Sequence, residues 1–117
     1  MENKMKIYNN NVYPFDLVLS DDFDEVANKY DCNGEELIDH ANCRATTYIM
    51  NPKGCNTMAV GIVFKTEATP KLAAHEAFHA VYYMLAYGLK MELNDYTDET
   101  WAYLIGWVTD CIYDYVG

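Results

Sequence analysis

The sequence is poor in positive charge. It contains 18 Asp and Glu but only 8 Lys and Arg, which gives a formal net charge of −10 at pH 7. Such a field repels nucleic acid and anionic membrane surfaces, so we expect neither as a partner. An acidic surface that imitates nucleic acid and binds a DNA-handling protein is an alternative, although most acidic surfaces serve solubility alone.

Export signals, membrane spans and disulfide patterns are also missing. The N-terminal stretch MENKMKIYNNNVYPF lacks the apolar core of a signal peptide, and no apolar run is long enough to cross a membrane. The four cysteines, Cys32, Cys43, Cys55 and Cys111, form no C-x-x-C pair. We therefore expect reduced thiols and a cytoplasmic protein.

The composition is that of a globular protein. The chain has 117 residues, of which 51% are hydrophobic, and its 11 tyrosines favour an aromatic-rich interior or cleft. This length predicts one domain, residues 1–117, with a core of its own and no room for a second.

The first half of the chain predicts strands and short helices. Residues 13–20 alternate apolar and polar side chains, as in a half-buried strand, and residues 21–30 follow as a helix behind an aspartate cap. A further helical turn is expected over 33–41. Residues 44–50 and 57–65 are β-branched and apolar, and the sequence NPKG between them favours a type I turn, so an antiparallel hairpin is expected.

Two longer helices are predicted in the second half. Thr69 is the expected N-cap of the first, with Pro70 at its first position and Gly88 at its far end. Thr97 is the expected cap of the last helix. The apolar stripe of that helix consists of Trp101, Leu104, Ile105, Val108, Ile112 and Tyr115.

The first of these helices carries the motif HEAFH. His75 and His79 are four residues apart, so their Cβ atoms lie roughly 5–6 Å apart on one face, and both imidazoles can bind one ion. Glu76 is rotated by about 100° from His75 and therefore points toward a bound water rather than the ion. This is the general-base position of H-E-x-x-H hydrolases.

A catalytic zinc ion needs a third protein ligand. The metzincin continuation is not present, because Tyr82 and Leu85 occupy its glycine and histidine positions. Glu99 follows His79 by twenty residues, beyond a linker long enough to let the last helix fold back. Glu99 is therefore the candidate third ligand.

The sequence HEAFH, followed at this spacing by ETWAYLIGW, resembles the gluzincins, the thermolysin-like zinc peptidases. The resemblance covers residues 57–116 and extends to small zincin-like proteins of phages and mobile elements. It implies that His75, His79 and Glu99 bind Zn²⁺ and that Glu76 is the general base. It also implies an α+β zincin-like fold: a small, mainly antiparallel sheet with an N-terminal helix, the motif helix and a C-terminal glutamate helix.

The same resemblance suggests where a substrate would lie. In zincins the strand just before the motif helix forms the sheet edge that binds substrate, which here implies Ala59, Val60, Gly61 and Ile62. Candidate donors to the transition state are Tyr103, Tyr83 and Tyr96. His40 is expected to be a surface residue.

The favoured function is a zinc metallopeptidase that hydrolyses a peptide or protein. The first alternative is a zinc-stabilised, non-catalytic binding or inhibitor protein directed at a host or competitor factor. The second alternative is an interaction module that binds no metal. Substrate specificity and oligomeric state are not indicated by the sequence.

Overall fold

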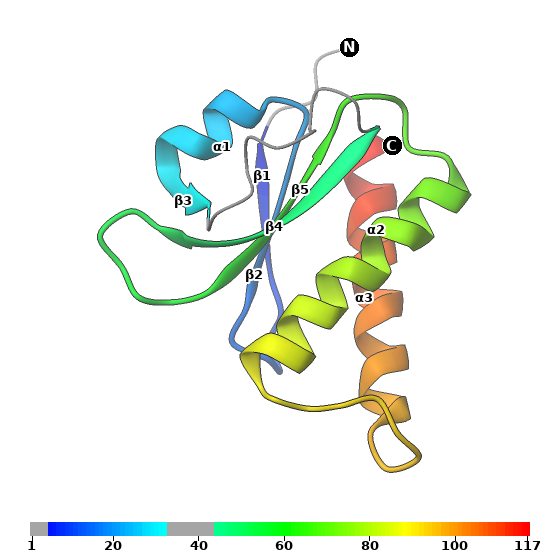
Figure 1. Ribbon diagram of the computed structural model, residues 1–117. Helices are drawn as coiled ribbons and strands as arrows, with labels where there is room; N and C mark the ends of the chain where they lie inside the picture. Colours follow the sequence, from blue (N-terminus) through cyan, green and yellow to red (C-terminus); the bar gives the residue numbers. More distant parts are fainter. Residues whose placement is uncertain (1–4, 33–43) are drawn as a thin grey trace.

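A computed structural model describes residues 5–32 and 44–117 (Figure 1). The helical turn expected over 33–41, with His40, and also Cys43 lie outside the described residues. The elements in chain order are β1 (Lys6–Asn9), β2 (Asp16–Ser20), α1 (Phe23–Lys29), β3 (Tyr30–Cys32), β4 (Ala45–Pro52), β5 (Ala59–Phe64), α2 (Pro70–Tyr82), the π-helical segment η1 (Tyr83–Gly88) and α3 (Asp98–Val116).

The strands form one mixed sheet in the order β1-β2-β5-β4-β3. The central pair, β2 and β5, is parallel, with Leu17 opposite Val60, whereas the other three pairs are antiparallel. Every residue of β5 is buried, and so is Val18 in β2. Strands that are buried on both faces are typically continuous apolar runs, so β2 is not the half-buried strand that its alternation predicted.

Each face of the sheet has its own helical cover (Figure 1). On one face, Leu17, Leu19, Val60 and Ile62 pack with buried residues of α2 and α3. On the other face, Val26 of α1 packs with a second cluster that includes Val18, Tyr48 and Met50. The helices therefore hold the two central strands from both sides.

The predicted caps of α1 and α2 and the predicted hairpin are confirmed, whereas Thr97 precedes α3 without a capping hydrogen bond from its side chain. Asp22 accepts a hydrogen bond from the backbone N–H of Asp24 at 3.0 Å, which caps α1. The Thr69 hydroxyl accepts one from the N–H of Leu72 at 3.1 Å, and Pro70 begins α2. Strands β4 and β5 pair antiparallel, as expected, with Thr47 opposite Ile62.

The turn of this hairpin lies one residue later than expected. Pro52 is the last residue of β4, and the Cys55 N–H donates to the Pro52 carbonyl at 3.0 Å. Gly54 has a φ of 79°, which is the conformation required at the third position of a type II turn. The predicted type I turn over NPKG is therefore wrong, because Gly54 takes the left-handed conformation that glycine allows.

The zincin-like α+β arrangement expected from the sequence is also wrong. The described residues form a small mixed α/β fold, with five strands in one sheet and three α-helices. Strand β5, expected at the sheet edge, lies between β2 and β4, because its side chains are apolar on both faces. Across residues 5–32 and 44–117, no three His, Cys, Asp or Glu side chains gather in a way that could hold a metal ion.

A polar cluster attaches β1 to the last helix. Lys6 Nζ and the Tyr8 hydroxyl each lie 2.7 Å from Asp114 Oδ2 on α3. The hydrogen bonds from Lys6 and Tyr8 hold the pKa of the Asp114 carboxyl below its usual range. Burial raises the pKa of the neighbouring Cys111 thiol to about 11, so this thiol stays protonated at neutral pH.

None of the helices that the structure describes is both long and apolar enough to span a membrane.

Gly61 on β5 generates a test of the sheet packing. A Cβ added at this position would lie 2.6 Å from Cε and 2.9 Å from Sδ of Met50, which is fully buried. We expect Gly61→Ala to lower the free energy of unfolding by about 1–3 kcal/mol in urea denaturation. The matched control is Gly106→Ala on α3, where an added Cβ meets nothing within 4 Å. It should raise stability by about 0.5–1 kcal/mol, and equal changes in the two variants would contradict this packing.

Candidate active site

Helix α2 has two faces of different chemistry. Its inner face packs against the sheet through fully buried small side chains: Ala73, Ala77, Ala80 and Val81. Glu76 lies on the same inner face, with only 4% of its surface exposed. The outer face carries four exposed side chains at positions i, i+3, i+4 and i+7: His75, Phe78, His79 and Tyr82.

The two histidines converge at their ring nitrogens. His75 Nε2 and His79 Nε2 are 3.1 Å apart, and the two rings are inclined at 75°. Two imidazole nitrogens bound tetrahedrally to one zinc ion at about 2.0–2.1 Å would lie roughly 3.3–3.4 Å from each other. The pair therefore fits two positions of a zinc site with almost no adjustment.

The Glu76 carboxylate is held from the sheet. The hydroxyl of Thr47 on β4 donates a hydrogen bond of 2.6 Å to Glu76 Oε1. The other oxygen, Oε2, lies 4.0 Å from His75 Nε2. A buried carboxylate needs hydrogen-bond donors, so the Thr47 hydroxyl stabilises Glu76 and leaves Oε2 on the side of His75.

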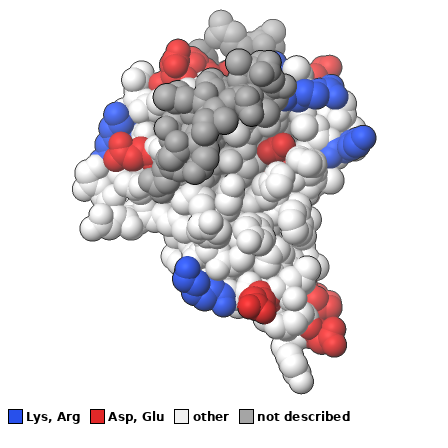
Figure 2. Space-filling view, viewed as in Figure 1, with Lys and Arg blue, Asp and Glu red and all other residues white. Residues whose placement is uncertain are grey.

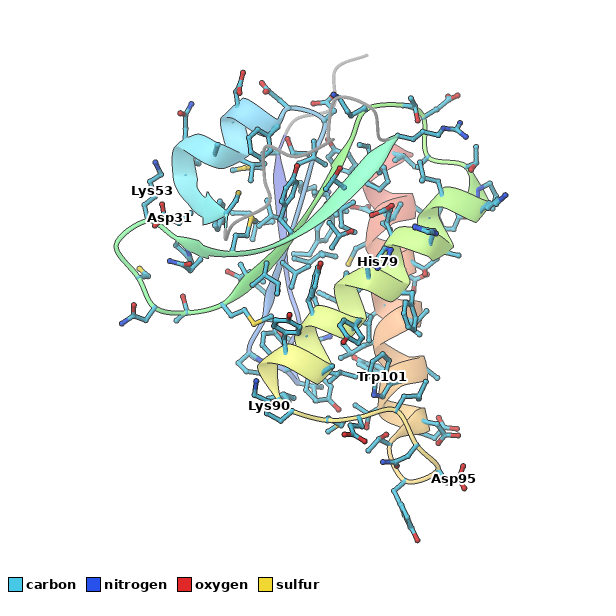
Figure 3. All side chains as sticks on the ribbon, in the orientation of Figure 1. Asp31, Lys53, His79, Lys90, Asp95 and Trp101 are labelled. Carbon is cyan, nitrogen blue, oxygen red and sulfur yellow. The ribbon has the colours of Figure 1, made fainter. Side chains whose placement is uncertain are left out.

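The structure does not bring Glu99 to the histidine pair. Figure 3 shows His79 midway along α2, whereas Asp95 lies at the tip of the loop that precedes α3. Trp101 is buried, with its ring centroid 6.0 Å from that of Phe78. Glu99 is two residues earlier, which places it about 200° around the helix from Trp101, and its side chain is exposed. The spacing of Glu99 fitted a ligand, but the register of α3 turns it outward.

The predicted tyrosine donors lie in three different places. Tyr96 is 97% exposed in the loop before α3, and Tyr103 packs beside Tyr13 with ring centroids 6.4 Å apart. Tyr83 is partly buried and contacts the rings of Tyr82 and Tyr87. Tyr82, three residues after His79, shares the exposed face of the histidines.

Strand β5, the predicted substrate-binding strand, is not at an edge of the sheet. Ala59, Val60, Gly61 and Ile62, the predicted substrate-binding residues, pair with both β2 and β4. Residues 45–49 of β4 pair with β5 on one side, and among the described strands only β3 lies on the other, opposite residues 50–52. Thr47 is in this stretch and contacts Glu76, so the part of β4 that lacks a second partner among the described strands runs past Glu76.

A pocket opens next to Glu76 and His75. Its volume is about 340 Å³, and its lining includes Arg44, Ala45, Lys71, Leu72, His75 and Glu76. A larger hollow, of about 440 Å³, is lined by other residues, among them Phe64 and Tyr115, and contains none of the motif side chains. The smaller pocket is therefore the one that belongs to the candidate site.

Comparison with protein families, curated proteins and solved structures finds no match for this chain. The likeness to gluzincins is thus confined to the motif and to the spacing of Glu99. The function must be argued from the side-chain geometry around His75, Glu76 and His79.

Thr47 is the site residue that the sequence analysis missed. It is 29 positions from Glu76, so no local spacing connects the two. The signal that was available is the alternation of β4, in which Tyr48 and Met50 face α1 while Ala45 faces α2. Because Thr47 is two residues after Ala45, it must face α2 as well.

The hydrogen bond from Thr47 can be tested by stability measurements. Thr47→Val leaves Oε1 of a buried carboxylate without this donor, so we expect it to lower the free energy of unfolding by about 1–3 kcal/mol at pH 7. Thr47→Ser keeps the hydroxyl and should therefore lower the free energy of unfolding by less than Thr47→Val. The matched control is Thr46→Val, because the Thr46 hydroxyl is buried and has no hydrogen-bond partner among the described residues. That variant should be neutral or stabilising, and similar losses at both positions in urea denaturation would argue against the hydrogen bond.

Proposed function

We propose that this chain is a zinc-dependent hydrolase that cleaves peptide bonds. The observation that carries the proposal is the approach of His75 Nε2 and His79 Nε2 to 3.1 Å, with Glu76 Oε2 4.0 Å from His75 Nε2. Two imidazole nitrogens this close together on one helix face are a typical partial ligand set for zinc. The resemblance of HEAFH to the gluzincin motif supports the same chemistry.

In this proposal His75 and His79 hold the ion. Glu99 stays the predicted third ligand, although its exposed side chain is turned away from the pair. Zinc supplies a Lewis acid and lowers the pKa of a water molecule to about 7. The histidines provide this without rearranging α2, because their nitrogens already lie at close to the required separation.

Glu76 is the proposed general base. Its Oε1 atom is engaged by the Thr47 hydroxyl, so Oε2 is the oxygen that can accept a proton from water. The same oxygen can then pass the proton to the leaving amine. Because Thr47 and the sheet hold the carboxylate in place, Oε2 does not have to reorient before each proton transfer.

Residues 45–49 of β4 are the proposed place for an extended peptide. On the side of β4 away from β5, no described strand pairs with these residues, which is the arrangement that strand addition uses. A peptide paired there would pass Thr47 and therefore lie beside Glu76. This replaces the expectation that Ala59, Val60, Gly61 and Ile62 bind the substrate, since β5 has no free edge.

A zinc-stabilised binding or inhibitor protein is the second candidate. It is favoured by the fact that the part of the chain the structure describes gathers two histidines but no third metal ligand. A structural site of this kind has no use for a buried carboxylate beside His75, which favours the enzyme. We place either activity in the cytosol, because the four cysteines of the sequence form no C-x-x-C pair and indicate reduced thiols.

Zinc content is the first test of the proposal. We expect about one zinc ion per chain by elemental analysis of protein prepared with zinc, and loss of most of it in His75→Ala and His79→Ala. Glu99→Ala should weaken zinc affinity if Glu99 is the third ligand, whereas Glu92→Ala, in the exposed loop before α3, should not. Protein that takes up no zinc on titration would contradict both candidate functions.

Substitution of the base separates an enzyme from a binder. Glu76→Gln has nearly the same shape and should keep the zinc, but it should lower peptide hydrolysis by about 10²–10⁴-fold, because the amide cannot accept a proton. Glu67→Gln, an exposed carboxylate before α2, removes the same charge and should leave hydrolysis unchanged. Equal cleavage by wild type and Glu76→Gln would show that Glu76 is not the base. No turnover by wild type over a broad peptide library would favour the binder.

A further inference from the structure

The pocket beside Glu76 is lined by two cations. Arg44, just before β4, and Lys71, in the first turn of α2, both contribute to its wall. They are two of only 8 Lys and Arg in a chain that has 18 Asp and Glu. A pocket with two positive side chains is therefore an exception to the charge of the protein as a whole.

Each of the two cations is exposed, and neither forms an ion pair with another residue that the structure describes. Figure 2 shows basic side chains at the upper right of the surface, over the region where β4 and α2 begin in Figure 1. Lys6, by contrast, is already paired with Asp114 at 2.7 Å.

The pocket is continuous with the candidate site. His75 and Glu76 form part of its wall, so a group bound by Arg44 and Lys71 would lie next to the reacting bond of the proposed hydrolase. Its volume of about 340 Å³ is at the small end of the range of ligand pockets, about 300–1,000 Å³. It can hold one residue of a peptide rather than a large ligand.

The charges of the pocket indicate which kind of peptide residue it would bind. A long polyanion would meet the acidic surface around the pocket, whereas a single carboxylate can be bound locally by two cations. Arg and Lys also offset the repulsion between such a carboxylate and the nearby Glu76.

We propose that Arg44 and Lys71 bind a carboxylate of the peptide substrate, so that the protein selects peptides with an acidic group next to the scissile bond. The inference rests on the proposed function of the same site and adds the class of substrate. The carboxylate belongs either to an Asp or Glu side chain or to the C-terminus of the peptide, and the two sources present the same chemistry.

Binding measurements test this without depending on catalysis. The probes are three fluorescent alanine hexapeptides: one blocked at both ends with a single glutamate, one blocked with glutamine in its place, and one with glutamine and a free C-terminal carboxylate. Each is titrated by fluorescence anisotropy with the full chain carrying Glu76→Gln, which prevents cleavage. EDTA is present so that no metal ion attracts the carboxylate.

We expect one of the two acidic peptides to bind about tenfold more tightly than the blocked glutamine peptide. Tighter binding of the glutamate peptide assigns the pocket to a side chain, and tighter binding of the free acid assigns it to a C-terminus. Arg44→Gln with Lys71→Gln should remove the preference without changing the affinity for the blocked glutamine peptide. Arg44→Glu with Lys71→Glu should reverse the charge preference, so that a further blocked peptide with lysine in place of glutamate binds more tightly than the acidic peptides.

The control variant is Lys29→Gln with Lys53→Gln. It removes the same charge from exposed positions, and Lys53 lies on the far side of the molecule from the start of α2 in Figure 3. This variant should keep the preference for the acidic peptide. If the preference depended on net charge alone, the variant would lose it. Equal binding of all three peptides, or a preference that survives Arg44→Gln with Lys71→Gln, would overturn the inference.

The outcome is separable from that of the proposed function. If the charge preference is found but wild type cleaves nothing, the hydrolase proposal fails and carboxylate binding stands. If wild type cleaves acidic and neutral peptides at equal rates, and binding also shows no preference, the carboxylate inference alone fails.

Discussion

The close packing of α2 against the sheet decides where every group of the candidate site lies. Ala73, Ala77 and Ala80 are fully buried, and their small side chains let the helix approach β4 and β5. At that distance Glu76 cannot reach solvent freely and instead meets the Thr47 hydroxyl. His75 and His79 lie about 100° and 60° around the helix from Glu76, on the same side, and are turned outward by the same contact.

Local features of the fold could be predicted, whereas strand order could not. Asp22 and Thr69 cap their helices because capping depends on a few neighbouring residues, and the β4–β5 hairpin follows from two apolar runs joined by a short turn. The position of β5 between β4 and β2 depends on contacts between distant parts of the chain. A run such as AVGIVF is compatible with either an edge or a central strand until its neighbours are known.

The residues of the candidate site likewise fall into those whose positions could be predicted from local sequence and those whose positions could not. The separation of His75 and His79 is a property of one helical turn, so the sequence predicts their convergence directly. Glu99 depends on the register of α3, and burial of Trp101 against Phe78 set that register. Thr47 and Arg44 approach α2 from β4 and its start, and no spacing within the motif points to them.

The parallel pairing of β2 and β5 has a consequence for how the chain folds. The β4–β5 hairpin and the helices are made of neighbours in sequence and can form early, but β2 must pair with a strand that follows α1, β3 and β4. Closing so long a loop carries an entropic cost and makes such contacts slow to form. The face on which α2 packs includes residues of both central strands. A chain in which β2 has not yet paired with β5 therefore lacks Leu17 and Leu19, which form part of the core beneath α2, the helix that carries the candidate site.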